Sequence, residues 1–178
     1  AHSFNFYKKL KQKIKFEIIQ EKNFDRAIQL FNKTNQFNFS LNRYTDISLK
    51  KLIKNQMYST KLISFKDKFG DHGIIGAYII KKKKLSIEII DFVLSCRVLN
   101  RYLEELIIIK IIKDYSNKNL SIFFKKEQVN NELIPVFLKK NYFNFKKKNK
   151  NIYEYGLSLT NNYHEIEKIF RYWIKENI

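Results

Sequence analysis

Hydrophobic and polar positions along the chain change period repeatedly, which predicts a mixture of strands and helices without an internal repeat. Short alternating or β-branched runs indicate strands, and apolar residues that recur on one helical face indicate helices. The predicted strands span residues 15–20, 57–65, 73–82, 85–95, 119–124, 142–147 and 152–159. The predicted helices span residues 24–33, 45–53, 99–115, 131–140 and 163–174.

The order of these elements predicts an α/β fold of the mixed α+β kind. Three strands between residues 57 and 95 follow one another with only turn residues between them, which indicates a meander. A strand–helix–strand unit follows, so we expect one central mixed sheet of about seven strands with helices on both faces. Residues 1–14 are interpreted as a linker or entry helix, and residues 15–178 as one domain.

The amino-acid composition limits the classes of protein to which this chain can belong. Apolar residues make up 44% and charged residues 29% of the 178 positions, which excludes a wholly disordered chain. Cys96 is the only cysteine, so an internal disulfide framework and a cysteine-based zinc site are excluded, and no other metal-ligand spacing is present. No apolar run reaches the roughly 18 residues of a membrane span, and no secretory signal is visible. A cytoplasmic protein without metal or membrane is therefore predicted.

The formal net charge is +18, and it arises mainly from lysine. Only five of the 35 basic residues are arginine, a skew that is typical of AT-rich coding rather than of a surface that reads phosphates. Nucleic-acid binding is therefore not predicted. A field of this sign speeds the docking of an acidic protein or of a phosphorylated ligand.

Three segments carry a family resemblance: residues 33–45 (KTNQFNFSLNRYT), 66–76 (KDKFGDHGIIG) and 90–101 (IDFVLSCRVLNR). Together they resemble the C-terminal part of the FkbH-like proteins, through the TNQFN, FGD-x-G and SCRVL elements. The resemblance implies a GNAT-like acyltransferase fold. It also implies transfer of a glyceryl group from 1,3-bisphosphoglycerate to the phosphopantetheine thiol of an acyl carrier protein, with loss of phosphate.

The resemblance covers one half of the family's architecture. FkbH-like proteins couple this domain to a HAD-type phosphatase domain, whose DxDx(T/V)-like motif this sequence lacks. The chain therefore resembles the GNAT-like half, with an acyl carrier protein and a HAD-type phosphatase domain as implied partners. No tightly bound cofactor is expected, and coenzyme A or carrier-bound phosphopantetheine would be a substrate.

A GNAT fold holds the pantetheine phosphate with a loop of the form R/Q-x-x-G-x-G/A that opens the long helix, where glycines let the backbone approach. Asn100 and Tyr102 stand here at the glycine positions; asparagine tolerates a left-handed backbone, whereas Tyr102 would crowd a diphosphate. Leu138 stands where the fold often has a tyrosine that protonates the leaving thiolate. The residues that the resemblance assigns to phosphopantetheine binding are Arg97, Val98, Leu99, Asn100, Arg101 and Asn131.

Cys96 is the candidate nucleophile. It precedes a strand-to-helix turn and is followed by Arg97, and both features stabilise the thiolate, which is the nucleophilic form. With the resemblance, this position suggests that Cys96 carries the acyl group as a thioester, with backbone N–H groups of residues 97–99 as an oxyanion pocket. The alternative is a buried apolar cysteine at a strand end.

His72 and Asp71 are candidate partners of Cys96. If the turn at residues 81–84 pairs positions whose numbers sum to about 167, His72 and Asp71 lie opposite Ser95 and Cys96. His72 would then act as the base and Asp71 would orient it, or Asp71 would simply form the turn. Asp91 lies about 16 Å from Cys96 in an ideal strand, so it reaches the thiol only if a bulge intervenes.

The amides of Asn35, Gln36 and Asn38 lie in a stretch without helical period and suit the amides of pantetheine or glyceryl hydroxyls. Loop capping is the alternative. Arg43 is predicted to grip phosphate beside them, and a surface ion pair is its alternative. Two other functions stay open: a GNAT-type N-acyltransferase that uses acyl-CoA and a small amine, and a catalytically degenerate module that only binds a carrier protein.

Overall fold

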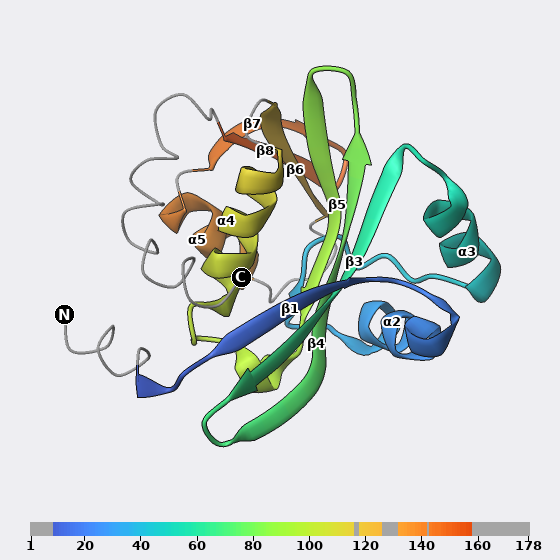
Figure 1. Ribbon diagram of the computed structural model, residues 1–178. Coiled ribbons are helices and arrows are strands. Elements are labelled where there is room, and N and C mark those ends of the chain that lie inside the picture. Colours follow the sequence, from blue (N-terminus) through green and yellow to red (C-terminus); the bar gives the residue numbers. More distant parts are fainter. Residues whose placement is uncertain (1–8, 116–117, 126–131, 142, 158–178) are drawn as a thin grey trace.

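The computed structural model describes residues 9–115, 118–125, 132–141 and 143–157, and their strands form one sheet (Figure 1). Eight strands belong to it, in the order β1-β3-β4-β5-β6-β8-β7, with β2 paired to β5 off this path. The strands are β1 (Lys13–Ile18), β2 (Phe37–Asn38), β3 (Tyr58–Asp67), β4 (Gly70–Lys82), β5 (Ser86–Leu94), β6 (Asn119–Lys125), β7 (Asn144–Asn149) and β8 (Ile152–Leu157). The helices are α2 (Glu21–Lys33), α3 (Asp46–Lys54), α4 (Leu103–Asp114) and α5 (Leu133–Lys140), and a 3₁₀ turn, η1, spans Cys96–Val98.

The predicted mixed sheet and meander are confirmed. Strands β3, β4 and β5 pair antiparallel in sequence order, and β5 pairs parallel with β6 after the α4 crossover. The predicted helix at residues 45–53 is confirmed as α3, and Thr45 caps it, because its hydroxyl accepts a hydrogen bond from the Ser48 amide at 3.2 Å. The strand count exceeds the prediction by one because β2, which contains only Phe37 and Asn38, has no alternating pattern of its own.

Helices cover both faces of the sheet, as predicted (Figure 1). Helices α2 and α3 pack on one face, where Phe31, Leu49, Leu62 and Val93 form a buried cluster. Helix α4 lies on the opposite face beside α5 and buries nearly its whole surface. Its run of leucine and isoleucine explains this, since an all-round apolar helix needs partners on every side.

Helix α4 starts at Leu103, four residues later than predicted. The chain leaves β5 through η1 and then takes a left-handed backbone at Asn100 and at Tyr102, each with φ of 62°. Two left-handed residues interrupt a right-handed helix, so the helix begins only after the second of them.

The predicted register of β4 and β5 is wrong near Cys96. Ile80 pairs with Ile89, but Ile79 pairs with Asp91, so Ile90 is an extra residue in a β-bulge. Beyond the bulge the Ser95 amide donates to the Ile75 carbonyl at 2.8 Å, three positions from the predicted partner His72.

Several predicted segments lie outside the described residues. These are the helix at residues 163–174, Asn131 and residues 1–8 of the entry segment. Within the described part of the chain, no helix is long and apolar enough to cross a membrane.

Close packing at Gly76 generates a stability prediction. A Cβ atom built there would lie 2.5 Å from Leu94 Cδ2 and 2.8 Å from the Val93 carbonyl oxygen. We expect Gly76→Ala to lower the free energy of unfolding by roughly 1–3 kcal/mol, measured by urea denaturation, because buried neighbours must move. Gly156→Ala is the control: its Cβ would meet only the flexible Lys146 side chain, so a change of about 0.5 kcal/mol or less is expected. Equal losses would contradict the packing argument.

Candidate active site

The Cys96 side chain is exposed at the end of β5, where η1 begins. It lines an open cleft of about 320 Å³ beside the C-terminal end of α2. Asn35 and Gln36 line the same cleft, together with Arg26 and Lys33. The structure therefore brings the predicted nucleophile together with two of the three predicted substrate amides, and it excludes the alternative of a buried cysteine.

Cations surround this cleft. Arg26 is held in place because its Nη2 donates to the Ile74 carbonyl at 3.0 Å, and Arg97 is held by the His72 carbonyl at 2.7 Å. Burial, and then the nearby positive charge of Arg97, lower the pKa of Arg26. No carboxylate is among the described residues that line the cleft. The site therefore favours an anion, such as a thiolate or a phosphate group.

His72 is not brought to Cys96. Its ring stacks on Phe65, with ring centroids 4.9 Å apart, and its Nε2 lies 3.2 Å from Oδ1 of Asp67. Phe65 belongs to the buried cluster on the α4 face, whereas Cys96 opens beside α2 on the other face. Asp71 does not orient His72, because its Oδ1 accepts from the Gly73 amide at 2.7 Å and forms the turn.

The positions of Asn38 and Arg43 correct two further predictions. Asn38 is 1% exposed; its Nδ2 donates to the Thr34 carbonyl at 3.0 Å, and its Oδ1 accepts from the Leu41 amide at 2.8 Å. Arg43 donates to the Phe31 carbonyl at 2.6 Å and so satisfies the C-terminal end of α2. Both side chains therefore shape the loop, and Arg43 also holds Asn35 Oδ1 at 2.6 Å.

The loop at residues 97–102 keeps the backbone form that glycines usually provide. Asn100 and Tyr102 are both left-handed, at the two positions where the GNAT pattern has glycine. Arg101, predicted to bind phosphate, is instead paired with Asp67 at 3.0 Å, and Val98 is buried in the core. Leu99 packs against that core as well.

The predicted oxyanion pocket is not available at two of its three amides. Val98 N donates to the Ser95 carbonyl at 3.1 Å, and Leu99 N donates to the Cys96 carbonyl at 3.3 Å. These two bonds close η1, so neither N–H group faces a substrate.

The carboxylate of Glu104 lies against the backbone of the loop at residues 97–102. Glu104 was not predicted from the sequence as a residue of the site. Its Oε1 accepts from the Asn100 amide at 2.9 Å, and its Oε2 is buried without a hydrogen-bond partner among the described residues. Burial raises the pKa of Glu104 to about 7, although its backbone hydrogen bonds act in the opposite direction. The available signal was a pair of carboxylates, Glu104 and Glu105, at the start of an otherwise apolar helix.

Asp91 lies at the β5 bulge and not beside Cys96. It is fully buried, and its Oδ2 accepts hydrogen bonds from the Tyr44 hydroxyl and, at 3.3 Å, from Asn42 Nδ2. Burial raises the pKa of Asp91 to about 7, against the effect of these donors. A second cavity, of about 600 Å³, lies nearby; Asn42, Tyr58, Glu88, Ile90 and Phe123 are among the residues that line it.

Strand β2 covers the edge of β5 beyond the bulge. Phe37 pairs with Leu94, Asn38 pairs with Val93, and the Phe39 amide donates to the Phe92 carbonyl at 3.0 Å. Strand β6 pairs with β5 only from Ser86 to Ile89. Beyond Ile89, β2 therefore takes the place of β6 beside β5.

Comparisons with known proteins identify the fold. No family model and no curated protein matches the chain, but solved acetyltransferase structures do. The spermidine N-acetyltransferase of Vibrio cholerae, in complex with CoA and spermine, is 9% identical over 85% of this chain and 98% of that chain, with a TM-score of 0.63. The PaiA N-acetyltransferase of Thermoplasma acidophilum, in complex with coenzyme A, is 12% identical over 81% and 98%, with a TM-score of 0.57. FdhC, a nucleotide-linked sugar GNAT, is 12% identical over 89% and 93%, with a TM-score of 0.63. The chain therefore has the GNAT fold.

The pKa values of Asp91 and Asp67 are shifted in opposite directions, which predicts opposite effects of pH on the free energy of unfolding. The raised pKa of Asp91 means that the folded state holds a proton that the unfolded state releases above about pH 4, so its contribution is lost as pH rises toward 7. In urea denaturation, the stability of Asp91→Asn relative to the wild type should rise by roughly 2–3 kcal/mol between pH 4.5 and 8.

Asp67→Asn is the matched control. Burial opposes ionisation of Asp67, but the hydrogen bond from the Phe69 amide, His72 and Arg101 lower its pKa. Its contribution is therefore present above about pH 4, so Asp67→Asn should cost most at neutral pH and least near pH 3. The same trend with pH for both variants would contradict these assignments.

Proposed function

We propose that this chain is an acyltransferase in which Cys96 carries the acyl group as a thioester and passes it to a pantetheine thiol. The observation that carries this proposal is the exposed Cys96 side chain in a cleft whose charged neighbours are cations. The CoA-bound state of the similar acetyltransferase structures supports thioester chemistry on this fold.

The transfer takes place in two acyl exchanges, in which the donor's leaving group is a phosphate or a thiol. The Cys96 sulfur attacks the donor carbonyl; the new S–C bond forms as the donor's bond breaks, and the leaving group takes up the proton that Cys96 gives up. The pantetheine thiol then attacks the Cys96 thioester, and the proton of that thiol returns to Cys96. Arg26 and Lys33 line the cleft with Cys96, and their positive charges attract an anionic group of the donor or of the pantetheine arm.

The finer proposal concerns the acyl group and its acceptor. The resemblance to the FkbH-like proteins suggests a glyceryl group and the phosphopantetheine arm of an acyl carrier protein. The net charge of +18 supports an acidic carrier, because opposite charges speed the encounter. The exposed amides of Asn35 and Gln36, which line the cleft, are suited to hydrogen-bond glyceryl hydroxyls or pantetheine amides.

A second candidate function is N-acyl transfer to a small amine. The cavity beside the β5 bulge supports it, because Glu88 lines this cavity and the buried Asp91 lies next to its lining residues Asn42 and Ile90. A carboxylate there can take a proton from an ammonium group. This reaction would not need Cys96.

Mass spectrometry of the intact protein distinguishes these functions. After incubation with an acyl thioester of N-acetylcysteamine, or with acyl-loaded carrier protein, the wild type should gain the mass of one acyl group and Cys96→Ala should gain none. His72→Ala should still form the adduct, since His72 is held at Asp67 and not at Cys96.

The other outcomes contradict the proposal. Acyl transfer that survives Cys96→Ala would support the amine acceptor. Carrier binding without an adduct or turnover in either protein would indicate a module that only binds the carrier.

A further inference from the structure

A strand edge with unpaired N–H and C=O groups can bind a ligand that contains amide groups. In this chain, the edge of β5 that could do so is already paired with β2. Beyond Ile89, β5 has lost β6 as a neighbour. The segment at residues 37–39 bonds to positions 92–94 in its place. A pantetheine arm that ran along β5 would need the same N–H and C=O groups, so it and β2 exclude one another.

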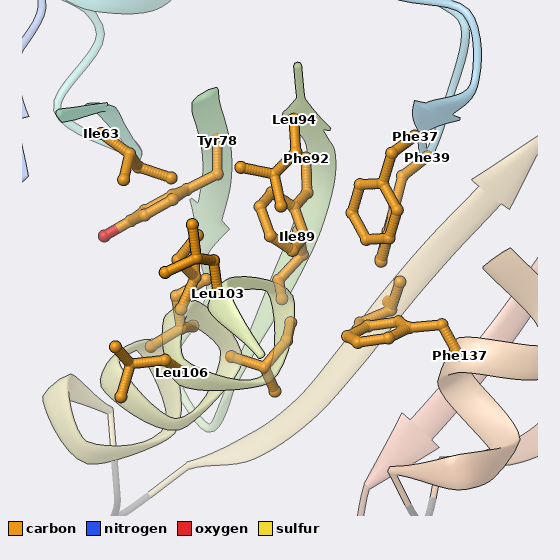
Figure 2. Packing of buried hydrophobic residues seen from close by; sticks show 14 of the residues in the cluster. Phe37, Phe39, Ile63, Tyr78, Ile89, Phe92, Leu94, Leu103, Leu106 and Phe137 are labelled. Carbon is orange, nitrogen blue, oxygen red and sulfur yellow. The ribbon is translucent and has the colours of Figure 1, made fainter. Parts of the chain in front are cut away.

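Aromatic packing holds β2 in this place. Phe37 is 3% exposed and Phe39 is fully buried. The Phe37 ring lies 5.2 Å from that of Phe92 and 5.4 Å from that of Phe137 on α5, and Figure 2 shows these rings together. Displacing β2 would expose both phenylalanines, which makes the closed arrangement the favoured one.

The phosphate end of the same path is also occupied. The N-terminus of α4 and the left-handed loop before it form the kind of site that binds anions. The Glu104 carboxylate lies there, 6% exposed, with Oε1 on the Asn100 amide and Oε2 buried without a partner in the described structure. The charged groups that act on it are Glu105 on α4 and Lys140 on α5.

We infer that this chain occupies its own groove for a phosphopantetheine arm, with β2 in place of the arm's amides and the Glu104 carboxylate in place of its phosphate. The inference rests on the second candidate function, N-acyl transfer at the cavity beside the β5 bulge. An arm with its phosphate at the loop before α4 and its amides along residues 92–94 carries its thioester toward that cavity and away from Cys96. Binding of the arm displaces β2 from β5 and displaces or neutralises the Glu104 carboxylate. Coenzyme A, which this fold implies as a substrate, does not fit the groove while both are in place.

Two consequences follow. The apparent affinity for the arm is lowered by the fraction of molecules that are open, so a change that loosens β2 tightens binding. A protonated Glu104 can donate a hydrogen bond to a phosphate, whereas the ionised form repels it. Because burial raises the pKa of Glu104 to about 7, binding should weaken as pH rises through 7.

Hydrogen exchange of the wild-type protein tests the displacement directly. Dephospho-CoA is the probe, since its diphosphate is a diester without a group that titrates near pH 7. On saturation, the amides of residues 37–39 should exchange at least tenfold faster. Saturation without any change at residues 37–39 would overturn the inference.

Phe37→Ala tests the affinity, with Phe24→Ala as the matched control. Both remove a buried phenyl ring, but Phe24 lies on α2 and belongs to the buried cluster on the other face of the sheet from that of Phe37. Calorimetry should show at least tenfold tighter binding of dephospho-CoA to Phe37→Ala than to the wild type, and no such gain for Phe24→Ala. Equal affinity of Phe37→Ala and wild type, including no binding by either, would overturn the inference.

Glu104→Gln tests the phosphate end. It should bind dephospho-CoA about tenfold more tightly than the wild type at pH 8 and equally well at pH 6. Glu105→Gln, which alters the neighbouring buried carboxylate, should keep a pH dependence, with its midpoint moved to lower pH because the Glu105 charge that raises the pKa of Glu104 is removed. The same pH dependence in Glu104→Gln as in the wild type would overturn the role of Glu104. These binding assays involve no acyl transfer, so their failure is distinct from loss of the Cys96 adduct, which bears on the proposed function alone.

Discussion

Strand β5 runs through the middle of the sheet, so the N–H and C=O groups on both of its edges need hydrogen-bond partners. Strand β4 satisfies one edge along its length, but β6 satisfies the other only as far as Ile89. The bulge at Ile90 changes the course of β5 at this point, and β2 supplies the remaining partners. The pairing of β5 with both β4 and β2 ends at Leu94, η1 begins at Cys96, and the side chain of Cys96 is exposed there.

Most of the fold could be predicted because its signals are local. The period of 57–95, the cap at Thr45 and the apolar run of α4 each depend on neighbouring residues, and the structure confirms the elements they predict. Strand β2 could not be predicted, because two residues carry no period and their partners lie more than 50 positions away. The β4–β5 turn lies one residue later than predicted, which shifts the pairing by two positions, and the bulge at Ile90 adds a third, so His72 is not opposite Ser95.

In the candidate site, too, some placements could be predicted from the sequence, and those that depend on distant partners could not. Asn35, Gln36 and Cys96 line one cleft because the residues that follow α2 lie beside the end of β5. The predicted roles of His72 as a base and of Arg101 as a phosphate ligand were wrong for the same reason, because both side chains pair with Asp67. A carboxylate 34 positions from its arginine is not visible as a partner in the sequence, whereas its burial in the folded chain makes it a strong competitor for both side chains.

The loop before α4 has an unfavourable backbone conformation, and contacts within the chain compensate part of its free-energy cost. A left-handed backbone costs about 1–2 kcal/mol at Tyr102 and less at Asn100, because asparagine tolerates this conformation better than other residues with a side chain. The Glu104 carboxylate offsets part of this cost through its bond to the Asn100 amide, and Lys140 lies 5.8 Å from the centre of the Tyr102 ring. The edge of β5 is likewise satisfied from within the chain, since β2 pairs with its backbone at Val93 and Leu94. At both places the chain supplies its own hydrogen-bond partners, while the Cys96 side chain between them stays exposed.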